Sequence, residues 1–453
     1  MSISQVQEKF RDPREARKVF FASFIGTTFE YYDFIIYGAA AALIFGPQFF
    51  PTGDPTVSQL AAFSTFAVGF VTRPLGGIIA GHFGDRIGRK RILTLSLLTM
   101  GLSTIAVGFL PNYSQIGVAA PIILVVLRLI QGLAVGAEWG GAALMAVEHA
   151  PAKRRSFYGS APQIGVPAGS VLANIVLLAL VAVTGTQFDA WGWRIAFILS
   201  VVLVVIGLII RNNLHESPLF AQAAKVKTAR VPILSVLRNY PVSVLLTLFG
   251  NASAAAVGYL ILTFILSYGT APKIGYSRDQ ILTIIIISGL IWTASMPVMG
   301  LLADRFGRLK IMITGICVQF LAVLAFFPLF NTGVIALAIL ACTIGLVANA
   351  ASYASLPSMF SDLFPTNLRY SGISLGFQFG AIVGGGLMPI IATAVFAATG
   401  NSLFIGIYLA ALTALTALAI VVSHSKAVTT KIANAESTLL DGAPATPPQA
   451  PVR

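Results

Sequence analysis

A nine-residue pattern, G-x-x-x-D-R-x-G-R, occurs twice in this chain, from Gly81 to Arg89 and again from Gly300 to Arg308. The two copies lie 219 residues apart in a chain of 453, and long apolar runs flank both of them. The repetition predicts two similar bundles of helices joined head to tail. Duplicated bundles of this kind are typical of proteins that move solutes across a membrane.

Composition places these bundles in a lipid bilayer. Hydrophobic residues make up 57% of the chain, charged residues 10%, and the mean hydropathy is +0.86. That leaves too little polar surface for a water-soluble globule. A transmembrane helix needs about 20 mainly apolar residues, and twelve segments qualify. They cover residues 20–46, 57–81, 92–110, 119–147, 157–184, 193–211, 241–269, 278–302, 311–330, 333–360, 371–398 and 402–423. The predicted fold class is an all-α membrane protein with twelve transmembrane helices in two pseudo-symmetric six-helix bundles.

The basic residues indicate how these helices cross the membrane. Alternate loops, counted from the N-terminus, hold 24 of the 29 Lys and Arg residues. Because basic residues are retained on the cytoplasmic side, both termini are predicted to be cytoplasmic. The chain then divides into an N-terminal segment (1–19), a first bundle (20–211), a linker (212–240), a second bundle (241–424) and a tail (425–453). The tail ends in GAPATPPQAPVR, a composition that cannot bury a core, and we expect it to be disordered.

Several classes of function are excluded by the residues present. The formal net charge is +13, but the bases are spread over seven membrane-flanking segments, so we expect no nucleic-acid partner. The chain has neither a G-x-x-x-x-G-K-[ST] stretch nor an H-E-x-x-H motif, and its four histidines are scattered. We therefore expect no enzyme, no metal and no cofactor, with a proton as the coupling ion.

The repeated pattern predicts short, charged turns between helices. A second repetition follows the fourth and tenth segments, where Glu148 precedes Arg155 by seven residues and Asp362 precedes Arg369 by seven. We expect these pairs to act as cytoplasmic latches, although the positive-inside rule alone also accounts for the basic residues. The predicted gating residues are Gly81, Asp85, Arg86, Gly88, Arg89, Glu148, Arg155, Asp304, Arg305, Gly307, Arg308, Asp362 and Arg369.

Several stretches resemble a known family. GHFGDRIGRK resembles the signature between the second and third helices of the major facilitator superfamily, and LRLIQGLAVGAEWGGAALMAVEHAP resembles the fourth helix of its metabolite:proton symporter family. The stretches EYYDFIIYG, FVTRPLGG, WGWRIAF and LFPTNLRYSG add to this likeness. Glu138–Gly141 and the stretch that ends at Gly386 are most similar to shikimate-type permeases. The resemblance implies two six-helix domains around one central site, open alternately to either side of a bacterial cytoplasmic membrane.

Ionisable residues inside the spans are the best candidates for coupling. The first half places five of them there, namely Glu30, Asp33, Arg73, Arg128 and Glu138. Each costs roughly 2.5 to 3.5 kcal/mol at a helix centre on insertion scales, so they must pair or face water. A carboxylate beside an arginine can exchange a proton when an incoming anion competes for that arginine. Asp33 is the first choice for the proton carrier, followed by Glu30 and Glu138. The alternative is a set of fixed ion pairs that only hold helices together.

The resemblance also bears on the cation of this centre. In the superfamily an R-x-x-Q-G pattern on the fourth helix is associated with proton coupling, and here it reads Arg128, Gln131 and Gly132. The resemblance therefore implies that Arg128 belongs to the coupling centre.

The second half lacks mid-span charge but carries amides and phenols that can bind hydroxyl groups. Helix packing through hydrogen bonds is the alternative reading of each one. An anionic group near an arginine and a hydroxylated body against the neutral residues suit a small monocarboxylate. The predicted substrate-binding residues are Arg73, Arg128, Tyr37, Gln131, Gln163, Asn251, Tyr259, Asn349, Tyr353 and Gln378.

The sequence thus predicts a proton-coupled symporter that imports a small organic acid, such as shikimate, by alternating access. Importers of di- or tricarboxylates, or of osmolytes such as proline and betaine, are alternatives. An uncoupled facilitator would share the fold and lack a titrating carboxylate. The expected partners are a small-molecule substrate and the lipid bilayer, and we expect a monomer.

Overall fold

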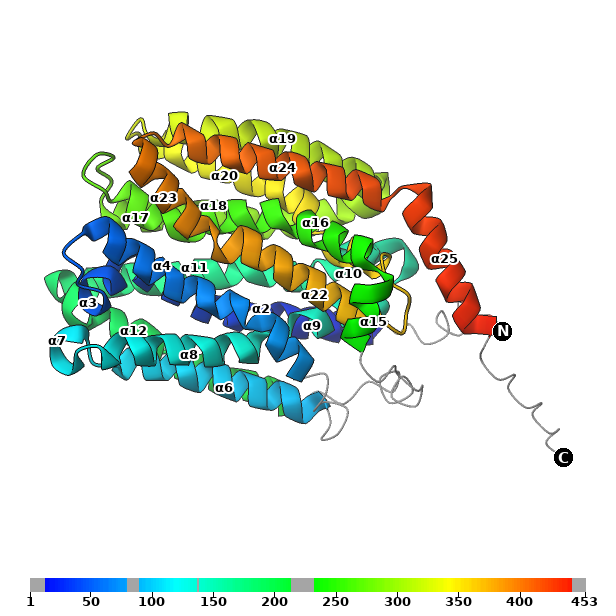
Figure 1. Cartoon of the computed structure of the whole chain (residues 1–453), viewed down its shortest axis with the longest axis horizontal. Helices are drawn as coiled ribbons and strands as arrows, with labels where there is room; N and C mark the ends of the chain where they lie inside the picture. The colour runs from blue at the N-terminus through cyan, green and yellow to red at the C-terminus, as the bar shows by residue number, and fades with distance from the viewer. Residues whose placement is uncertain (1–12, 80–88, 137, 213–231, 442–453) are drawn as a thin grey trace.

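The computed structural model describes residues 13–79, 89–136, 138–212 and 232–441, and the regular secondary structure in these residues is helical. Most helices run along the long axis of the molecule, and the two halves of the chain lie side by side (Figure 1). The short helices α3 and α7 lie at one end of the molecule, here called the α3 end. The helices α15 and α25 lie at the other, the α25 end (Figure 1).

The first half forms six spans. Their elements are α2 (Pro13–Ala40), η1 (Ala41–Phe45) and α3 (Gly46–Phe49); α4 (Pro55–Val71), which continues to Ile79; α6 (Arg89–Phe109); α8 (Ala119–Val135) and α9 (Trp139–Glu148); α10 (Arg155–Gly159) and α11 (Ala161–Thr184); and α12 (Trp193–Ile198) and α13 (Ser200–Asn212). Short pieces connect them, namely α7 (Tyr113–Ile116), η2 (Ala152–Arg154), η3 (Gly185–Gln187) and η4 (Phe188–Gly192).

The second half forms six more spans. They are α16 (Pro241–Tyr259), η5 (Leu260–Phe264) and α17 (Ile265–Gly269); α18 (Arg278–Phe306); α19 (Arg308–Phe330); α20 (Ile335–Tyr353) and α21 (Leu356–Ser361); α22 (Arg369–Ala381), η6 (Ile382–Gly386) and α23 (Met388–Thr399); and α24 (Leu403–Ser423). Helix α15 (Pro232–Asn239) lies in the linker, and α25 (Lys426–Asp441) follows the last span.

The helices have the length and hydropathy of membrane spans. Nine helices in the described part of the chain are long and apolar enough to cross a bilayer. One of them, Ala152–Ile209, has 58 residues; at 1.5 Å per residue this is enough for two crossings of a hydrocarbon core about 30 Å thick. Together with α2 and α6, whose first turns are charged, these helices account for the twelve spans that the sequence predicts.

Local sequence sets the helix ends. Helix α4 begins at Pro55, whose ring fixes a helical φ angle and whose missing N–H needs no partner in the first turn. The Asp54 carboxylate caps the helix by accepting hydrogen bonds from the backbone N–H groups of Thr56 (2.7 Å) and Val57 (3.3 Å). Between α18 and α19, Gly307 has a φ of 98°, a value that favours glycine. The turn between α18 and α19 therefore requires a glycine at this position of the repeated pattern.

The duplication extends beyond the sequence pattern. The π-helical turns η1 and η5 begin at Ala41 and Leu260, which are separated by the same 219 residues as the two copies of the pattern. A π turn widens a helix locally and is frequent at functional sites. Helix α2 packs against η5, and α17 packs against η1. Each widened turn therefore lies against the first or the seventh span of the other half.

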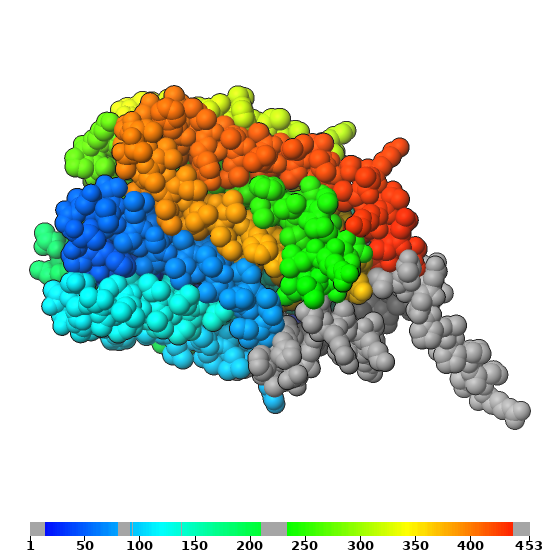
Figure 2. Space-filling model, in the orientation of Figure 1, coloured from blue at the N-terminus to red at the C-terminus, as the bar shows by residue number. Residues whose placement is uncertain are grey.

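The two halves pack directly against each other. Helix α11 of the first half contacts α18 of the second, and α4 contacts η6 and α23. On the face shown in Figure 2 the first half, in blue and cyan, meets the second half, in orange and green, along a continuous seam. Any passage between the halves must therefore open by moving one half relative to the other.

The chain after the last span differs from its prediction. Residues Lys426–Asp441 form helix α25, so the prediction of a disordered tail is wrong for this part; residues 442–453 lie outside the described residues. Ile432 is buried, and the Glu436 carboxylate binds Arg369 at 3.1 Å and accepts from the Thr366 backbone N–H at 2.9 Å. Contacts with the loop before α22 thus order a segment whose composition alone did not predict a helix.

Candidate functional site

Asp33 lies at the centre of a buried hydrogen-bond network in the first half. Its carboxylate accepts one hydrogen bond from Ser200 on α13 (2.6 Å) and one from Thr104 on α6 (3.0 Å). The Thr104 oxygen accepts from the Gln131 amide at 2.9 Å, and the Gln131 carbonyl accepts from Arg128 at 3.1 Å. All five side chains are buried. Asp33 and Arg128 are therefore connected through two neutral residues, and the described residues show no direct ion pair between them.

The two buried arginines share one aromatic ring. The guanidinium carbons of Arg73 and Arg128 each lie 3.9 Å from the centroid of the Phe34 ring. Phe70 also contacts Arg73, at 4.4 Å, and Tyr37 contacts Arg128, at 4.1 Å. Such cation–π contacts stabilise a cation without consuming its hydrogen-bond donors.

The donors of these arginines are not all used. In both Arg73 and Arg128 the Nε and Nη2 atoms are buried and have no hydrogen-bond partner among the described residues. These two atoms form one edge of the guanidinium plane, the edge that binds a carboxylate through two parallel hydrogen bonds. Since buried donors normally have partners, the arginines are suited to an anionic ligand.

Glycines bring α4 and α8 close enough to bury Arg128. A Cβ atom on Gly69 would lie 2.4 Å from the Nε atom of Arg128. A Cβ on Gly132 would lie 2.3 Å from the backbone oxygen of Gly69, and one on Gly136 would lie 1.9 Å from that of Arg73. Any side chain at these positions would force the helices apart. The glycine of the R-x-x-Q-G pattern thus has a packing role beside Arg128.

The other two predicted carboxylates lie on the same half. Glu30 is buried on α2, one turn before Asp33, and Glu138 is half-buried just before α9. A Cβ on Gly26 would lie 3.4 Å from a carboxylate oxygen of Glu138, so this group lies against α2. Each of the two carboxylates has an interaction partner.

A small cavity lies between the two halves. Its polar lining includes Tyr31 from α2, Asn251 and Tyr259 from α16, Trp292 from α18 and Tyr353 from α20, and Phe377 from α22 adds an aromatic ring. Its volume of about 20 Å³ holds roughly one water molecule. The Asn251 Oδ1 and Trp292 Nε1 atoms have no hydrogen-bond partner among the described residues. The cavity is therefore too small for a substrate in this conformation, although polar atoms in its lining can still form hydrogen bonds with one.

The other predicted substrate-binding residues, including Arg73 and Arg128, do not line this cavity. The Tyr37 hydroxyl donates to Thr65 at 2.8 Å, and Asn349 donates to the backbone oxygen of Ala254 at 2.8 Å. Gln378 is buried in α22. These contacts hold neighbouring helices together, which is the packing role that the sequence left open as an alternative.

Gln163 connects the two halves. Its carbonyl oxygen accepts from the Trp139 indole at 3.0 Å, and its amide donates to the backbone oxygen of Tyr353 at 3.2 Å. Trp139 in turn stacks on Phe377, with ring centroids 3.3 Å apart. These contacts join the two halves beside the cavity, because Tyr353 and Phe377 also belong to its lining.

Sequence reasoning missed several residues of the site. Phe34, Thr104, Ser200, Tyr31 and Trp292 were not singled out, although they contact the arginines, contact Asp33 or line the cavity. Hydroxyl and aromatic residues are too frequent in membrane helices to mark a site by themselves. Only their meeting in space identifies them.

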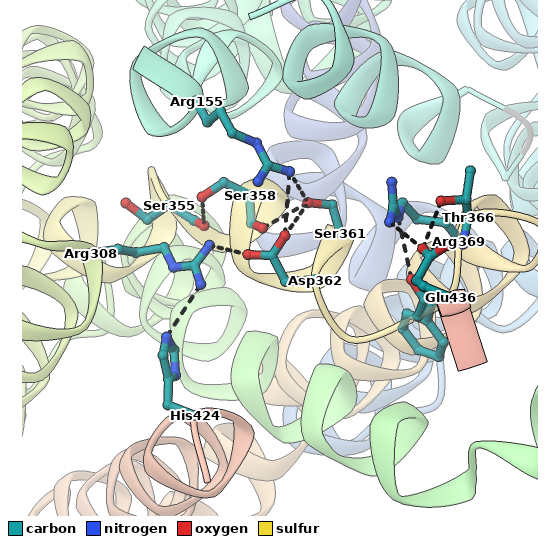
Figure 3. Close-up of polar contacts among 11 residues, drawn as sticks. Arg155, Arg308, Ser355, Ser358, Ser361, Asp362, Thr366, Arg369, His424 and Glu436 are labelled. Carbon is teal, nitrogen blue, oxygen red and sulfur yellow. Dashed lines mark hydrogen bonds and ion pairs between the residues drawn. The ribbon is translucent and has the colours of Figure 1, made fainter. Parts of the chain in front are cut away.

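At the α25 end, charged residues join the halves (Figure 3). Asp362, after α21, binds Arg155 of the first half at 3.3 Å and Arg308 of its own half at 2.9 Å. The Asp304 carboxylate accepts from the backbone N–H groups of Ser156 and Phe157 at the start of α10, both at 2.9 Å. An aspartate from the second copy of the repeated pattern thus caps a helix of the other half.

The partners at this end differ from those that the seven-residue spacing suggested. Asp362 binds Arg155 across the halves, while Arg369 binds Glu436 of α25 (Figure 3). Arg305 contacts the Phe306 ring. Of the first copy of the pattern, Gly81, Asp85, Arg86 and Gly88 lie outside the described residues.

A second contact joins the halves at the α3 end. Arg278, at the start of α18, binds Asp189 in η4 at 2.7 Å, and Gln48 donates to the backbone oxygen of Asp189. With contacts at both ends, the structure represents an occluded arrangement of the two halves. Within the described residues, no group of three or more His, Cys, Asp or Glu residues could hold a metal ion.

Comparison with known proteins identifies the family. The family profile described as Major Facilitator Superfamily matches residues 20–389, and an overlapping second match covers residues 274–447. The chain belongs to the major facilitator superfamily. It is thus a multi-pass membrane transporter and not an enzyme, as the sequence predicted.

Relatives within the superfamily span almost the whole chain. The inner membrane metabolite transport protein YhjE of Escherichia coli (strain K12) is 40% identical over 92% of this chain and 96% of its own. The shikimate transporter of the same organism is 40% identical over 89% of this chain and 94% of its own, and its proline/betaine transporter is 36% identical over 88% and 81%. These relatives agree with the predicted likeness to shikimate-type permeases.

Solved structures show the same fold at lower identity. The xylose transporter XylE from E. coli, in a partially occluded inward open conformation, superposes with a TM-score of 0.69 at 17% sequence identity. The match covers 89% of this chain and 96% of that one.

Proposed function

We propose that this chain is a proton-coupled symporter that imports a small hydroxylated monocarboxylate, such as shikimate, by alternating access. It would lie in a bacterial inner membrane with both termini and the α25 end in the cytoplasm. The observation that carries the proposal is the pair of buried arginines, Arg73 and Arg128, whose carboxylate-binding edges have no partner among the described residues.

The balance of buried charge favours one carboxylate and one proton. Four charged side chains of the first half are buried, namely Glu30, Asp33, Arg73 and Arg128, and their formal charges cancel. Protonation of one carboxylate leaves one net positive charge, which a single substrate carboxylate neutralises. A tricarboxylate would leave an uncompensated negative charge in a medium where isolated charges are costly.

The neutral half supplies groups for the rest of the substrate. The Asn251 Oδ1 atom can accept a hydrogen bond from a hydroxyl group, and the Tyr259 hydroxyl and Trp292 Nε1 can donate one. The aromatic rings of Trp292, Tyr353 and Phe377 offer apolar surface for a carbon ring. The likeness to a shikimate transporter over most of the chain supports this substrate class.

A zwitterionic osmolyte is the second candidate. Its quaternary ammonium group would suit the aromatic lining of the same cavity, because ammonium cations bind to the faces of Trp and Tyr rings. The 36% identity to a proline/betaine transporter supports this reading. For both candidate substrates, Arg73 and Arg128 would bind the carboxylate group.

Uptake into proteoliposomes tests the proposal. The purified protein would be given labelled shikimate, 2-oxoglutarate, citrate or betaine, with the lumen more alkaline than the outside. We expect accumulation of shikimate above equilibrium and its collapse when a protonophore removes the gradient. Shikimate uptake that only equilibrates would indicate a facilitator, and accumulation of citrate or betaine instead would contradict the proposed substrate class.

A further inference from the structure

Thr104 occupies the one position in the network of Asp33 where a hydroxyl group faces two alternative acceptors. Its Oγ1 atom lies 3.0 Å from the Asp33 Oδ2 atom and 3.0 Å from the backbone oxygen of Met100. A hydroxyl has one hydrogen and can donate to only one of them at a time. We propose that Thr104 is a positioning residue, a rotating hydroxyl that transmits the protonation state of Asp33 to Arg128 through Gln131. The inference rests on the proposed function and adds a coupling path to it.

When Asp33 is ionised, every donor in the path points toward it. Arg128 donates to Gln131, Gln131 donates to Thr104, and Thr104 donates to the carboxylate. The orientation of the Gln131 amide is fixed, because its carbonyl must face the arginine and its N–H groups must then face Thr104. A chain of hydrogen bonds aligned between a cation and an anion is mutually strengthening in a low-dielectric interior. In this state the negative charge of Asp33 partly balances the positive charge of Arg128 through these hydrogen bonds.

When Asp33 is protonated, the alignment must reverse at Thr104. The added proton resides on the Oδ2 atom, because Oδ1 keeps its hydrogen bond from Ser200 at 2.6 Å. The carboxylic acid then donates to the Thr104 oxygen, and the Thr104 hydrogen rotates to the backbone oxygen of Met100. No bond within Thr104 breaks, and the oxygen now accepts from both Asp33 and Gln131. The path ends on a neutral group, so Arg128 loses its negative counterpart.

Among the described residues around Asp33, this path of hydrogen bonds is what connects its carboxylate to a basic group. Arg128 on α8 is the basic group connected to it, and Arg73 lies beyond Phe34. On its own helix the ionisable neighbours are Glu30, Tyr32 and Tyr37. The Tyr32 hydroxyl donates to the backbone oxygen of Ala196, and the Tyr37 hydroxyl donates to Thr65.

The helices packed around Asp33 add no further charge near it. Helix α11 has no charged residue, α13 contributes Ser200, and α6 contributes Thr104. On α12, Arg194 donates to the backbone oxygens of Gly108 and Leu110 near the α3 end. Glu138 lies against Gly26, almost two turns before Asp33 on α2.

The consequence is a coupling free energy between proton and anion. A proton on Asp33 leaves the charge of Arg128 unbalanced within this path, so the Nε and Nη2 atoms of Arg128 bind the substrate carboxylate more strongly. By linkage, a carboxylate on Arg128 favours the proton on Asp33. Both ligands then enter together, which is the direction of coupling that symport requires.

Three variants separate this role from simple packing. Thr104→Val keeps the shape of the side chain and removes the hydroxyl. Thr104→Ser restores the hydroxyl. Ser103→Ala removes the hydroxyl of the neighbouring residue on α6, which donates to the backbone oxygen of Thr99 and lies outside the network of Asp33. Each protein would be reconstituted in proteoliposomes and assayed with labelled shikimate for counterflow at equal pH on both sides, and for accumulation driven by a pH gradient.

The readout is the half-saturating shikimate concentration for counterflow at pH 8 divided by that at pH 6. Coupled sites typically change each other's affinity by about 5- to 150-fold, and we expect a ratio in this range for the wild-type protein, Thr104→Ser and Ser103→Ala. For Thr104→Val we expect the ratio to fall to about twofold or less, with counterflow retained and accumulation lost. Retained counterflow shows that this variant folds and alternates.

The outcomes distinguish the two proposals. If the wild-type protein exchanges shikimate but does not accumulate it with a pH gradient, the proposed function fails and the path fails with it. If the wild-type protein accumulates shikimate and Thr104→Val keeps the wild-type ratio, only the path through Thr104 is overturned. Loss of the ratio in Ser103→Ala to the same extent as in Thr104→Val would also overturn it, because loss of any hydroxyl group on α6 would then suffice.

Discussion

The two halves of this transporter share a fold and differ in what they bury. The spans of the first half enclose Glu30, Asp33, Arg73 and Arg128, while the charged residues described in the second half lie near helix ends. Between the ends, the second half presents amides, phenols and indoles such as Asn251, Tyr259 and Trp292. The two halves of the duplicated chain thus differ in function. One half can respond to protons and anions, and the other can shape the site.

Both halves pack their helices closely. In the first half, Gly69, Gly132 and Gly136 bring α4 and α8 into backbone contact around Arg128. In the second half, Gly384 brings η6 equally close to α16, since a Cβ atom on it would lie 2.0 Å from the backbone oxygen of Ala252. Close contact around the charges keeps their geometry defined, so the halves differ in the charge that they bury and not in how closely their helices pack.

The largest effect is expected from Arg128→Ala. The substitution removes charge-assisted hydrogen bonds, each worth about 1.5–3 kcal/mol, and leaves the path from Asp33 without its cation. Initial rates of shikimate uptake should fall by about 100-fold or more. Arg128→Lys keeps the charge without the two-donor edge and should recover only part of the rate. If Arg128→Ala took up shikimate at more than half the wild-type rate, the claim that the charged half binds the substrate would be contradicted.

A smaller loss is expected from Gly69→Ala, because its new methyl group would lie 2.4 Å from the Arg128 Nε atom. Displacing the guanidinium by even about 1 Å is enough to weaken a positioned contact by tenfold or more. The matched control is Gly345→Ala in α20, where the nearest atom would be 3.7 Å away. Equal uptake rates for the two variants would show that tight packing around the charge is unimportant.

A weaker effect is expected in the neutral half. Asn251→Ala removes the hydrogen bond to the backbone oxygen of Phe377 and the free Oδ1 acceptor. A neutral hydrogen bond contributes about 1 kcal/mol, so the half-saturating shikimate concentration should rise about fivefold. The stoichiometry of protons per substrate, measured by flux of both, should not change. A change in stoichiometry would contradict the claim that the first half couples protons and the second half only contacts the substrate.

The smallest effect is expected at the membrane surface. Glu436→Gln removes the ion pair with Arg369, whose side chain is 19% exposed, while that of Glu436 is 31% exposed. Such pairs contribute about 0–1 kcal/mol, so uptake should change by less than about twofold while α25 becomes more sensitive to protease. If uptake fell as far as in Arg128→Ala, surface charges would matter as much as buried ones and the comparison would fail.

Helix α25 has a second point of attachment at this surface. The Lys431 ammonium group donates to the backbone oxygen of Asn239 at 2.8 Å and lies 5.2 Å from the Tyr240 ring. Burial and the Glu436 carboxylate both raise the pKa of the Tyr240 hydroxyl. Two attachments explain why loss of one ion pair should loosen α25 without releasing it.

Much of the fold follows from sequence because bilayer physics is simple. Long apolar runs must form helices to satisfy their backbone groups, so the twelve spans could be predicted from length and hydropathy. The helix α25 could not, since its order comes from Ile432 and Glu436 meeting partners on other segments.

The site was predictable only where its residues are conspicuous. Arg73, Arg128 and Asp33 stand out because charge is rare inside a membrane. Thr104 and Ser200 bind the Asp33 carboxylate, yet a hydroxyl residue in a helix carries no signal of its own. The seven-residue spacing of Asp362 and Arg369 suggested the wrong partners, because latches form between helices that are distant in sequence.

The central claim is that a carboxylate in the charged half carries the coupled proton, and Asp33→Asn tests it most directly. Proteoliposomes containing this variant would be assayed for shikimate accumulation driven by a pH gradient and for shikimate counterflow at equal pH. The account predicts that accumulation is lost while counterflow remains. Accumulation at the wild-type level in Asp33→Asn would contradict it.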